Sequence, residues 1–516
     1  MVYGGKPSTG CHLCRKRKIK CDEALPGCRN CSVYGRPCPG YRPDTIFRNE
    51  NQKVARLMRK RSSTPPDSQP SSRSTSVSLS RQESLLLLPH VVDSTWEERA
   101  VCHFFDQFTV DSDASDICLN HLGFLPSLYA ACRDSGRDDS VSSCLRLATE
   151  ATALIALSNQ MNASPLLLKA RAYYGMALHE LRNILSSRSQ AVKDETFATM
   201  VILSIFEDIS GERTGLASSH TKGFGFLMKL RGEGQLSHAQ GRDLFICAYV
   251  HTLIENIVLR ANIRYSSADL IFGQLDPSEP VPRLMITATK IGHLFAESSS
   301  GQGSSEVDTV TQITGWIETG RLLALEMADW GQHLPDNWLP LVVHTRTGES
   351  FLTYQNISIA AIWTYYRAAR IALQRHMLDL RDTLASIVND SQTVQREAAL
   401  EEIEELTTDT CRAIPFSLGD IDALGKPIPA SIEGRPPVRA IYGYLMQWPL
   451  WYVLTFGLGT AAQMEQIRSS LSRVGSVLGI KLALVLAQHG SVSGHTAALT
   501  PNSFQLMPSM GEVSCI

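Results

Sequence analysis

The sequence predicts a small metal-binding module at the N-terminus, joined by a linker to a large all-α body. Six cysteines recur with regular spacing within residues 11–38. Residues 62–84 are rich in serine, proline and glutamine, a composition typical of a disordered tether. Beyond the tether, apolar residues recur every three or four positions, and no alternating strand pattern of useful length is present. This periodicity indicates helices packed on helices.

The cysteines form two halves of the same pattern, C-x2-C-x6-C, with six residues between the halves. They are Cys11, Cys14, Cys21, Cys28, Cys31 and Cys38. Closely spaced thiolates suit a soft tetrahedral ion such as zinc, at Zn–S distances of about 2.3 Å. Each tetrahedral ion needs four ligands, so six sulfurs serve two ions only if two sulfurs bridge. The duplication favours one bridge per half, most economically Cys11 and Cys28.

A strongly basic run lies inside this cysteine frame. Arg15-Lys16-Arg17-Lys18-Ile19-Lys20 places five cations in six residues. Residues 1–61 carry fifteen Lys/Arg and four Asp/Glu, a net charge of +11, so residues 62–516 carry −13 of the total of −2. A basic head of this kind has the electrostatic footprint of a nucleic-acid-binding module, whereas the acidic body would be repelled by DNA.

The cysteine-rich segment closely resembles the fungal Zn(II)2Cys6 binuclear-cluster transcription factors. The agreement runs from Gly10-Cys11 to Cys38-Pro39-Gly40-Tyr41 and includes every cysteine spacing, the basic run, and Pro26 before Cys28. The resemblance implies two short helices around two structural zinc ions. One ion would be bound by Cys11, Cys14, Cys21 and Cys28, and the other by Cys11, Cys28, Cys31 and Cys38.

The same resemblance assigns DNA contacts within the basic run. Arg17 and Lys18 correspond to the end of the first short helix, which lies against the major groove, usually over a CGG-type triplet. We expect these two side chains to contact bases. The other cations would mainly contact phosphates: Arg15, Lys16, Lys20 and Arg29.

A disulfide framework is the alternative interpretation of the six cysteines. It requires an oxidising compartment, and residues 1–10 contain no apolar core resembling a signal peptide. The seven other cysteines are scattered, and we expect them to be ordinary buried thiols: Cys102, Cys118, Cys132, Cys144, Cys247, Cys411 and Cys515. No phosphate-binding loop, H-E-x-x-H or G-x-S-x-G motif is present, so the sequence does not indicate an enzyme.

The body contains helical segments expected at 96–108, 145–155, 168–181 and 197–209. Several landmarks resemble the large helical regulatory domain that accompanies many of these zinc-cluster factors. They are Asp194-Glu195-Thr196, Glu207, His220-Thr221-Lys222-Gly223, Arg231-Gly232, Trp330, Leu334-Pro335, Trp338, Ile362 to Arg367 and Trp448-Pro449-Leu450.

One uncharged segment raises the possibility of a membrane span. Ala440 to Met464 is twenty-five residues long and contains no charged side chain, which is sufficient to cross a bilayer. Pro449 and the mid-segment tryptophans Trp448 and Trp451 are unusual within a span. A buried helix of the body therefore explains this segment better.

These observations predict a zinc-cluster DNA-binding domain at 1–43, a linker at 44–93, an all-α regulatory domain at 94–490 and a disordered tail at 491–516. The basic part of the linker, residues 44–61, lacks a sustained heptad repeat. We expect a nuclear, sequence-specific regulator of RNA polymerase II transcription that binds double-stranded DNA and transcriptional coregulators, with homodimerisation possible. The alternatives are a zinc-cluster corepressor or scaffold that acts through protein contacts, and a membrane-tethered regulator.

Overall fold

The computed structural model describes residues 10–24, 26–40, 94–110, 121–134, 139–213, 218–259, 273–300, 306–345, 348–388, 393–428 and 438–489. The chain divides into two units, residues 1–91 and 92–516, and each is described by itself. The described residues do not include the linker expected at 44–93 or the tail expected at 491–516. The structure therefore does not test the expectation that the linker lacks a coiled coil.

The first unit is built on two helices of five residues each, α1 (His12–Lys16) and α2 (Arg29–Val33). Its buried core, within the described residues, consists of Cys11, Cys14, Cys28 and Cys31. Helices this short are not stable alone in water, and four thiols supply little apolar area. The fold of this unit therefore depends on what the sulfurs bind.

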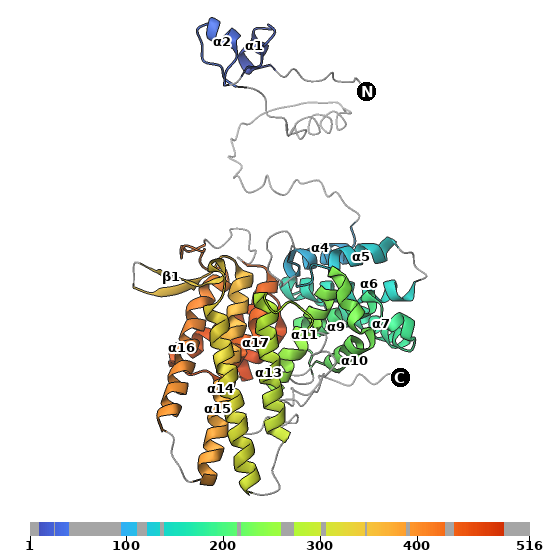
Figure 1. Ribbon diagram of the computed structural model, residues 1–516. Helices are drawn as coiled ribbons and strands as arrows, with labels where there is room; N and C mark the ends of the chain where they lie inside the picture. The colour runs from blue at the N-terminus through green and yellow to red at the C-terminus, as the bar shows by residue number, and fades with distance from the viewer. Residues whose placement is uncertain are drawn as a thin grey trace, which may run out of the picture. The chain divides into compact units, whose positions relative to one another are not determined.

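In the described part of the second unit, the regular secondary structure is helical apart from one hairpin and an isolated β-bridge between Ile421 and Pro427, in agreement with the predicted all-α body (Figure 1). Its α-helices are α4 (Trp96–Phe108), α5 (Leu125–Asp134), α6 (Ser140–Met161), α7 (Ser164–Leu185), α8 (Arg188–Ala191), α9 (Asp194–Ser210), α10 (Thr221–Arg231), α11 (Ala239–Leu259), α13 (Pro280–Ser300), α14 (Glu306–Gln332), α15 (Ile357–Val388), α16 (Thr393–Ser417), α17 (Ala440–Phe456), α18 (Ala461–Ser476) and α19 (Lys481–His489). Short 3-10 helices occur at η3 (Glu233–Ser237) and η4 (Asp336–Trp338).

The hairpin is the departure from the predicted helical pattern. Strands β1 (Leu341–His344) and β2 (Ser350–Thr353) pair antiparallel, with Leu341 opposite Thr353 and His344 opposite Ser350. Gly348 adopts a left-handed conformation with φ of +87° in the connecting turn, which glycine does without steric cost. Strands of four residues are too short for alternation to separate them from a loop.

Local sequence signals explain where the predicted helices begin and end. Thr95 and Glu98 form a capping box at the start of α4, which satisfies two backbone N–H groups. The bounds of α4 coincide with the predicted segment at 96–108. Helix α9 ends at Gly211, which is left-handed with φ of +71°. A Cβ at Gly211 would lie 2.9 Å from the Cβ of Lys481, so glycine also permits α19 to approach closely.

The helices of the second unit share one continuous core that extends from Ala100 to Ala487. Helix α6 packs against α4, α5, α7 and α9. The long helices α13, α14, α15 and α16 lie side by side (Figure 1). Helix α17 packs against α15 and α18, and α19 returns to contact α9. This arrangement surrounds α9 and α17 with other helices.

The uncharged segment at 440–464 does not form a single long helix. Helix α17 ends at Phe456, and α18 begins at Ala461 after a non-helical connection. Trp448 and Trp451 are buried in the core as predicted. Among the described residues, only α6 is long and apolar enough to cross a membrane, and 78% of its apolar window is buried inside the body.

The scattered cysteines follow the expectation of buried thiols with one exception. Cys132, Cys144, Cys247 and Cys411 are buried, whereas Cys102 is exposed. Cys102 lies on α4 between core residues, on the side of the helix that faces away from Phe104 and Phe108. Cys118 and Cys515 lie outside the described residues.

Candidate metal centre

The two short helices of the first unit begin at cysteines that are equivalent in the duplicated pattern. Cys11 is the N-cap of α1, and its sulfur accepts a hydrogen bond from the backbone N–H of Cys14 at 3.4 Å. Cys28 is the N-cap of α2, and its sulfur accepts from the N–H of Cys31 at 3.3 Å. A side-chain oxygen usually makes this capping contact. Here the contact that begins each helix also fixes the position of a sulfur.

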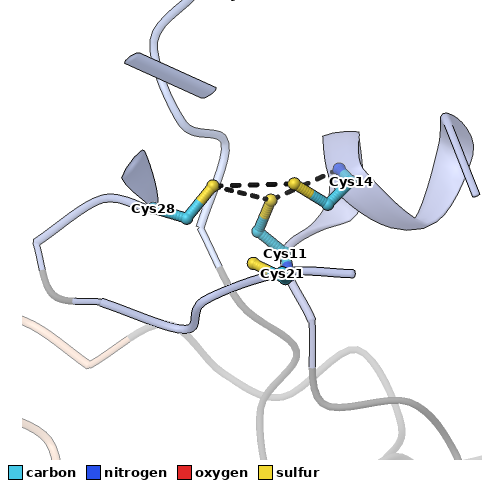
Figure 2. Close-up of side chains that lie close together, drawn as sticks. All are labelled: Cys11, Cys14, Cys21 and Cys28. Carbon is cyan, nitrogen blue, oxygen red and sulfur yellow. Dashed lines mark hydrogen bonds between the residues drawn. The ribbon is translucent and has the colours of Figure 1, made fainter. Parts of the chain in front are cut away.

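The six sulfurs fall into two sets of four, and the sulfurs of each set lie within 4.8 Å of one another. The sets are Cys11, Cys14, Cys21 and Cys28, and Cys11, Cys28, Cys31 and Cys38. Figure 2 shows the first set, in which the Cys28 sulfur lies 3.6 Å from those of Cys11 and Cys14. A tetrahedral zinc ion with Zn–S bonds of about 2.3 Å has S···S edges of about 3.8 Å. The spacing therefore fits two zinc ions that share the sulfurs of Cys11 and Cys28.

The pKa values of the thiols in this cluster shift in opposite directions. Burial raises the pKa of the Cys14 thiol to about 12. A backbone hydrogen bond is the main cause that lowers the pKa of Cys38 to about 7. Zinc binds thiolates, so its binding to this cluster releases protons. The positive charge of two ions compensates for thiolates that burial would otherwise keep protonated.

The two halves also share backbone conformations at positions seventeen residues apart. Lys18 has a φ of +56° where Gly35 has +71°, and Glu23 has +56° where Gly40 has +81°. Left-handed backbone is accessible to glycine and strained for residues with a Cβ. The first half therefore has charged side chains at two positions where the second half has glycine. The backbone at Lys18 fixes the direction in which its side chain leaves the frame.

The structure places most of the predicted DNA-contacting cations at the surface of this unit. Lys16, Lys18, Lys20 and Arg29 are exposed. The backbone N–H of Arg29 donates to Asp22 Oδ2 at 3.0 Å, which connects the start of α2 to the chain after the basic run.

The two remaining arginines contact neighbouring side chains of the module. Arg15 is half-buried, with its Nη2 3.0 Å from Nδ1 of His12. The guanidinium of Arg17 lies over the ring of Tyr34. Tyr34 was not among the predicted site residues. The duplicated pattern contains the signal, because Tyr34 occupies in the second half the position that Arg17 occupies in the first.

Comparison with known proteins identifies a domain in each unit. Residues 9–45 match the family model of the fungal Zn(2)-Cys(6) binuclear cluster domain. Residues 140–280 match that of the fungal specific transcription factor domain. The chain therefore carries the two domains of the fungal zinc-cluster transcription factors, which confirms the resemblance seen in the sequence. A Zn(2)-Cys(6) domain binds two zinc ions, and the sulfur geometry fits this requirement.

Two relatives match short parts of the chain. The Aspercryptin biosynthesis cluster-specific transcription regulator atnN of Emericella nidulans is 51% identical over 41 residues, 8% of this chain and 7% of that protein. The uncharacterized protein AN5342 of the same species is 33% identical over 110 residues, 21% of this chain and 24% of that protein. The chain thus spans less than a quarter of the length of these two relatives.

A longer alignment extends over most of the chain at lower identity. The transcription factor dbaG of Emericella nidulans is 21% identical over 423 residues, 78% of this chain and 94% of that protein. No solved structure matches the chain significantly.

Proposed function

We propose that the chain is a nuclear, sequence-specific DNA-binding regulator of RNA polymerase II transcription that recognises CGG-type triplets. Cys11, Cys14, Cys21 and Cys28 would bind one structural zinc ion, and Cys11, Cys28, Cys31 and Cys38 the other. DNA recognition is assigned to residues 1–43, the connection to 44–93 and regulation to 94–490. An enzymatic role is not part of this proposal.

The observation that carries the proposal is the position of the exposed cations on a sulfur-clamped frame. Lys16 and Lys18 are both exposed, but only Lys18 leaves the frame from a left-handed backbone just after the end of α1. We assign base contacts to Arg17 and Lys18, and mainly phosphate contacts to Arg15, Lys16, Lys20 and Arg29. The net charge of +11 over residues 1–61 supports attraction to the DNA backbone.

Regulatory input and contacts with coregulators are assigned to the helical body. Positions 62–516, which include this body, carry a net charge of −13. Such a charge repels DNA and leaves the basic head to bind it. Homodimerisation on DNA is an additional proposal, since related half-sites could be bound by two heads. The spacing of selected DNA sites would reveal it.

Selection of bound duplexes from a random pool by the full chain tests the proposal. A recovered CGG-type triplet, and affinity that falls with salt, are the expected results. Binding without sequence preference, or no binding at low salt, would instead indicate a module that acts through protein contacts.

Two substitutions separate base reading from electrostatic anchoring on the selected site. Lys18→Ala should cost about 1–3 kcal/mol and reduce discrimination among base substitutions. Lys16→Ala should weaken all sequences about equally and reduce the salt slope by about one unit. Equal loss on every sequence for both variants would contradict the assignment of Lys18.

A further inference from the structure

The helical body contains a partly open cavity of about 140 Å³ lined by residues of helices α11, α13, α15 and α17. Most of its lining is aliphatic or aromatic, from side chains such as Ile254, Leu284 and Trp448. His121, Cys247 and His251 also line it. A thiol and two imidazoles in an apolar cavity are an unusual group, because buried polar side chains normally have partners.

These three side chains converge from two parts of the fold. Cys247 and His251 lie four residues apart on α11, so they project from the same face of that helix. His121 lies in the turn that precedes α5. The sulfur of Cys247 and one ring nitrogen from each histidine all lie within 4.8 Å of one another. Three donor atoms of types that bind transition metals therefore share one small volume.

The position of His251 is set by a second layer of hydrogen bonds. The Tyr444 hydroxyl donates to Asp208 Oδ2 at 2.7 Å. The oxygen of this hydroxyl lies 3.3 Å from Nε2 of His251. Because the Tyr444 proton is directed to Asp208, its oxygen accepts from the Nε2–H of His251. This tautomer leaves a lone pair on Nδ1 of His251. In histidines that bind metals, the ring nitrogen that does not bind the ion typically makes such a hydrogen bond.

His121 supplies an independent observation. Its Nε2 atom is buried and has no hydrogen-bond partner within the described structure. A buried polar atom without a partner is costly, and a cation in the cavity would provide one.

We propose that His121, Cys247 and His251 form a third metal site, separate from the N-terminal cluster, for a divalent ion of the zinc type. Two imidazoles and one thiolate are a ligand set suited to zinc. Three protein ligands leave the fourth tetrahedral position open, as in many zinc sites that bind water or a small molecule. The adjoining cavity has room for such a fourth ligand. Metal binding would connect the turn at His121 to α11 and, through Tyr444, to α17.

Counting zinc ions on the full-length protein tests the proposal. Native mass spectrometry after incubation with zinc alone should find three ions on the wild type. Cys247→Ser and His251→Gln should each retain two. Cys132→Ser is the matched control, since Cys132 is another buried thiol of the body that is not one of the three proposed ligands. This variant should retain three zinc ions. Cys28→Ala should lose cluster ions and retain the third.

Thermal unfolding provides a second readout that does not depend on DNA binding. Added zinc should raise the Tm of the helical body in the wild type and not in His121→Gln, with helical content checked by circular dichroism. If Cys247→Ser does not fold, His121→Gln and His251→Gln carry the test. A folded wild type that binds only two ions and shows no zinc-dependent shift would overturn the proposal. An organic adduct that depends on His121, without a third metal ion, would also overturn it.

Discussion

The guanidinium carbon of Arg17 lies 3.5 Å from the centroid of the Tyr34 ring, so the ends of α1 and α2 are in direct contact. Arg17 is the C-cap of α1 and Tyr34 the C-cap of α2. The two residues therefore join equivalent positions of the duplicated halves. A cation over an aromatic ring is held in a preferred orientation, which positions Arg17 next to Lys18.

Removal of the ring tests whether this contact prepares Arg17 for DNA. Tyr34→Ala should weaken binding to the selected duplex by about two- to fivefold, since an exposed cation–π contact contributes about 0.5–1 kcal/mol. Tyr34→Phe retains the ring and should bind as the wild type does. Fluorescence anisotropy with labelled duplex measures both. An increase in affinity for Tyr34→Ala would mean that the stack competes with DNA.

The left-handed backbone at Lys18 allows stability and DNA reading to be separated. Lys18→Gly should stabilise the zinc module by about 1 kcal/mol, because glycine adopts positive φ without strain. It should nevertheless lose base discrimination. Zinc release to a chromogenic chelator should be slower for Lys18→Gly than for Lys18→Ala, which retains a Cβ. Equal release rates would show that the backbone at this position is not strained.

The shared sulfurs predict unequal effects of two cysteine substitutions. Cys28→Ala leaves neither set with four sulfurs, whereas Cys38→Ala leaves the set of Cys11, Cys14, Cys21 and Cys28 complete. Relative to the wild type, Cys28→Ala should lose two zinc ions and Cys38→Ala one. Each structural site contributes on the order of 10 kcal/mol to folding. Native mass spectrometry of the full chain measures the loss, and identical losses for both variants would argue against a bridging Cys28.

The cysteine frame and the helical body could be predicted because their signals are local. Ligand spacing indicates a cluster without any knowledge of the fold, and the stripe of Phe104 and Phe108 with its capping box defines α4 to the residue. The stack of Arg17 on Tyr34 could not be predicted without knowledge of the path that the chain takes between the two halves. The convergence of His121 with Cys247 and His251 required the tertiary fold, because only the spacing on α11 is visible in the sequence.

The landmarks of the helical body became interpretable once the structure paired them. Arg231 Nη2, at the end of α10, lies 2.5 Å from Asp194 Oδ1, in the first turn of α9. Glu207 Oε1 lies 3.5 Å from His220 Nε2. In the sequence these residues are separate positions, each only weakly typical of the family. In the fold they make polar contacts that join α9 to α10 and to the turn that precedes α10.

The Asp194 contact predicts a defined pH dependence. Burial alone would raise the pKa of Asp194, but hydrogen bonds from Arg231 and His238 outweigh it and lower the pKa. A carboxyl whose pKa is lowered in the folded state stabilises the fold at pH values above its pKa in the unfolded chain, 3.8. This contribution is lost as the pH falls from there through the lower pKa of the folded state. Asp194→Asn should therefore cost about 1–3 kcal/mol near pH 7, a difference that shrinks below about pH 4.

Urea unfolding followed by circular dichroism measures this difference across the pH range. Asp382→Asn is the control, because Asp382 pairs with Arg396 while its side chain remains 58% exposed. Exposed pairs of this kind contribute about 0–1 kcal/mol. A difference for Asp194→Asn that does not change with pH would show that its ionisation does not contribute to stability.

Trp448 tests the packing of α17 in the core. Its ring meets that of Trp451 edge to face, with centroids 5.9 Å apart, and the guanidinium of Arg213 lies 5.6 Å from it. Only 6% of Trp448 is exposed, so Trp448→Ala should destabilise the body by about 3–5 kcal/mol through the cavity it leaves. Trp96→Ala is the matched control, since Trp96 is 46% exposed, and it should cost less than about 1 kcal/mol. Chemical denaturation of the full chain, followed by helical circular dichroism, gives both values. Equal small costs for the two variants would contradict the burial of Trp448 and with it the placement of α17 inside the helical body.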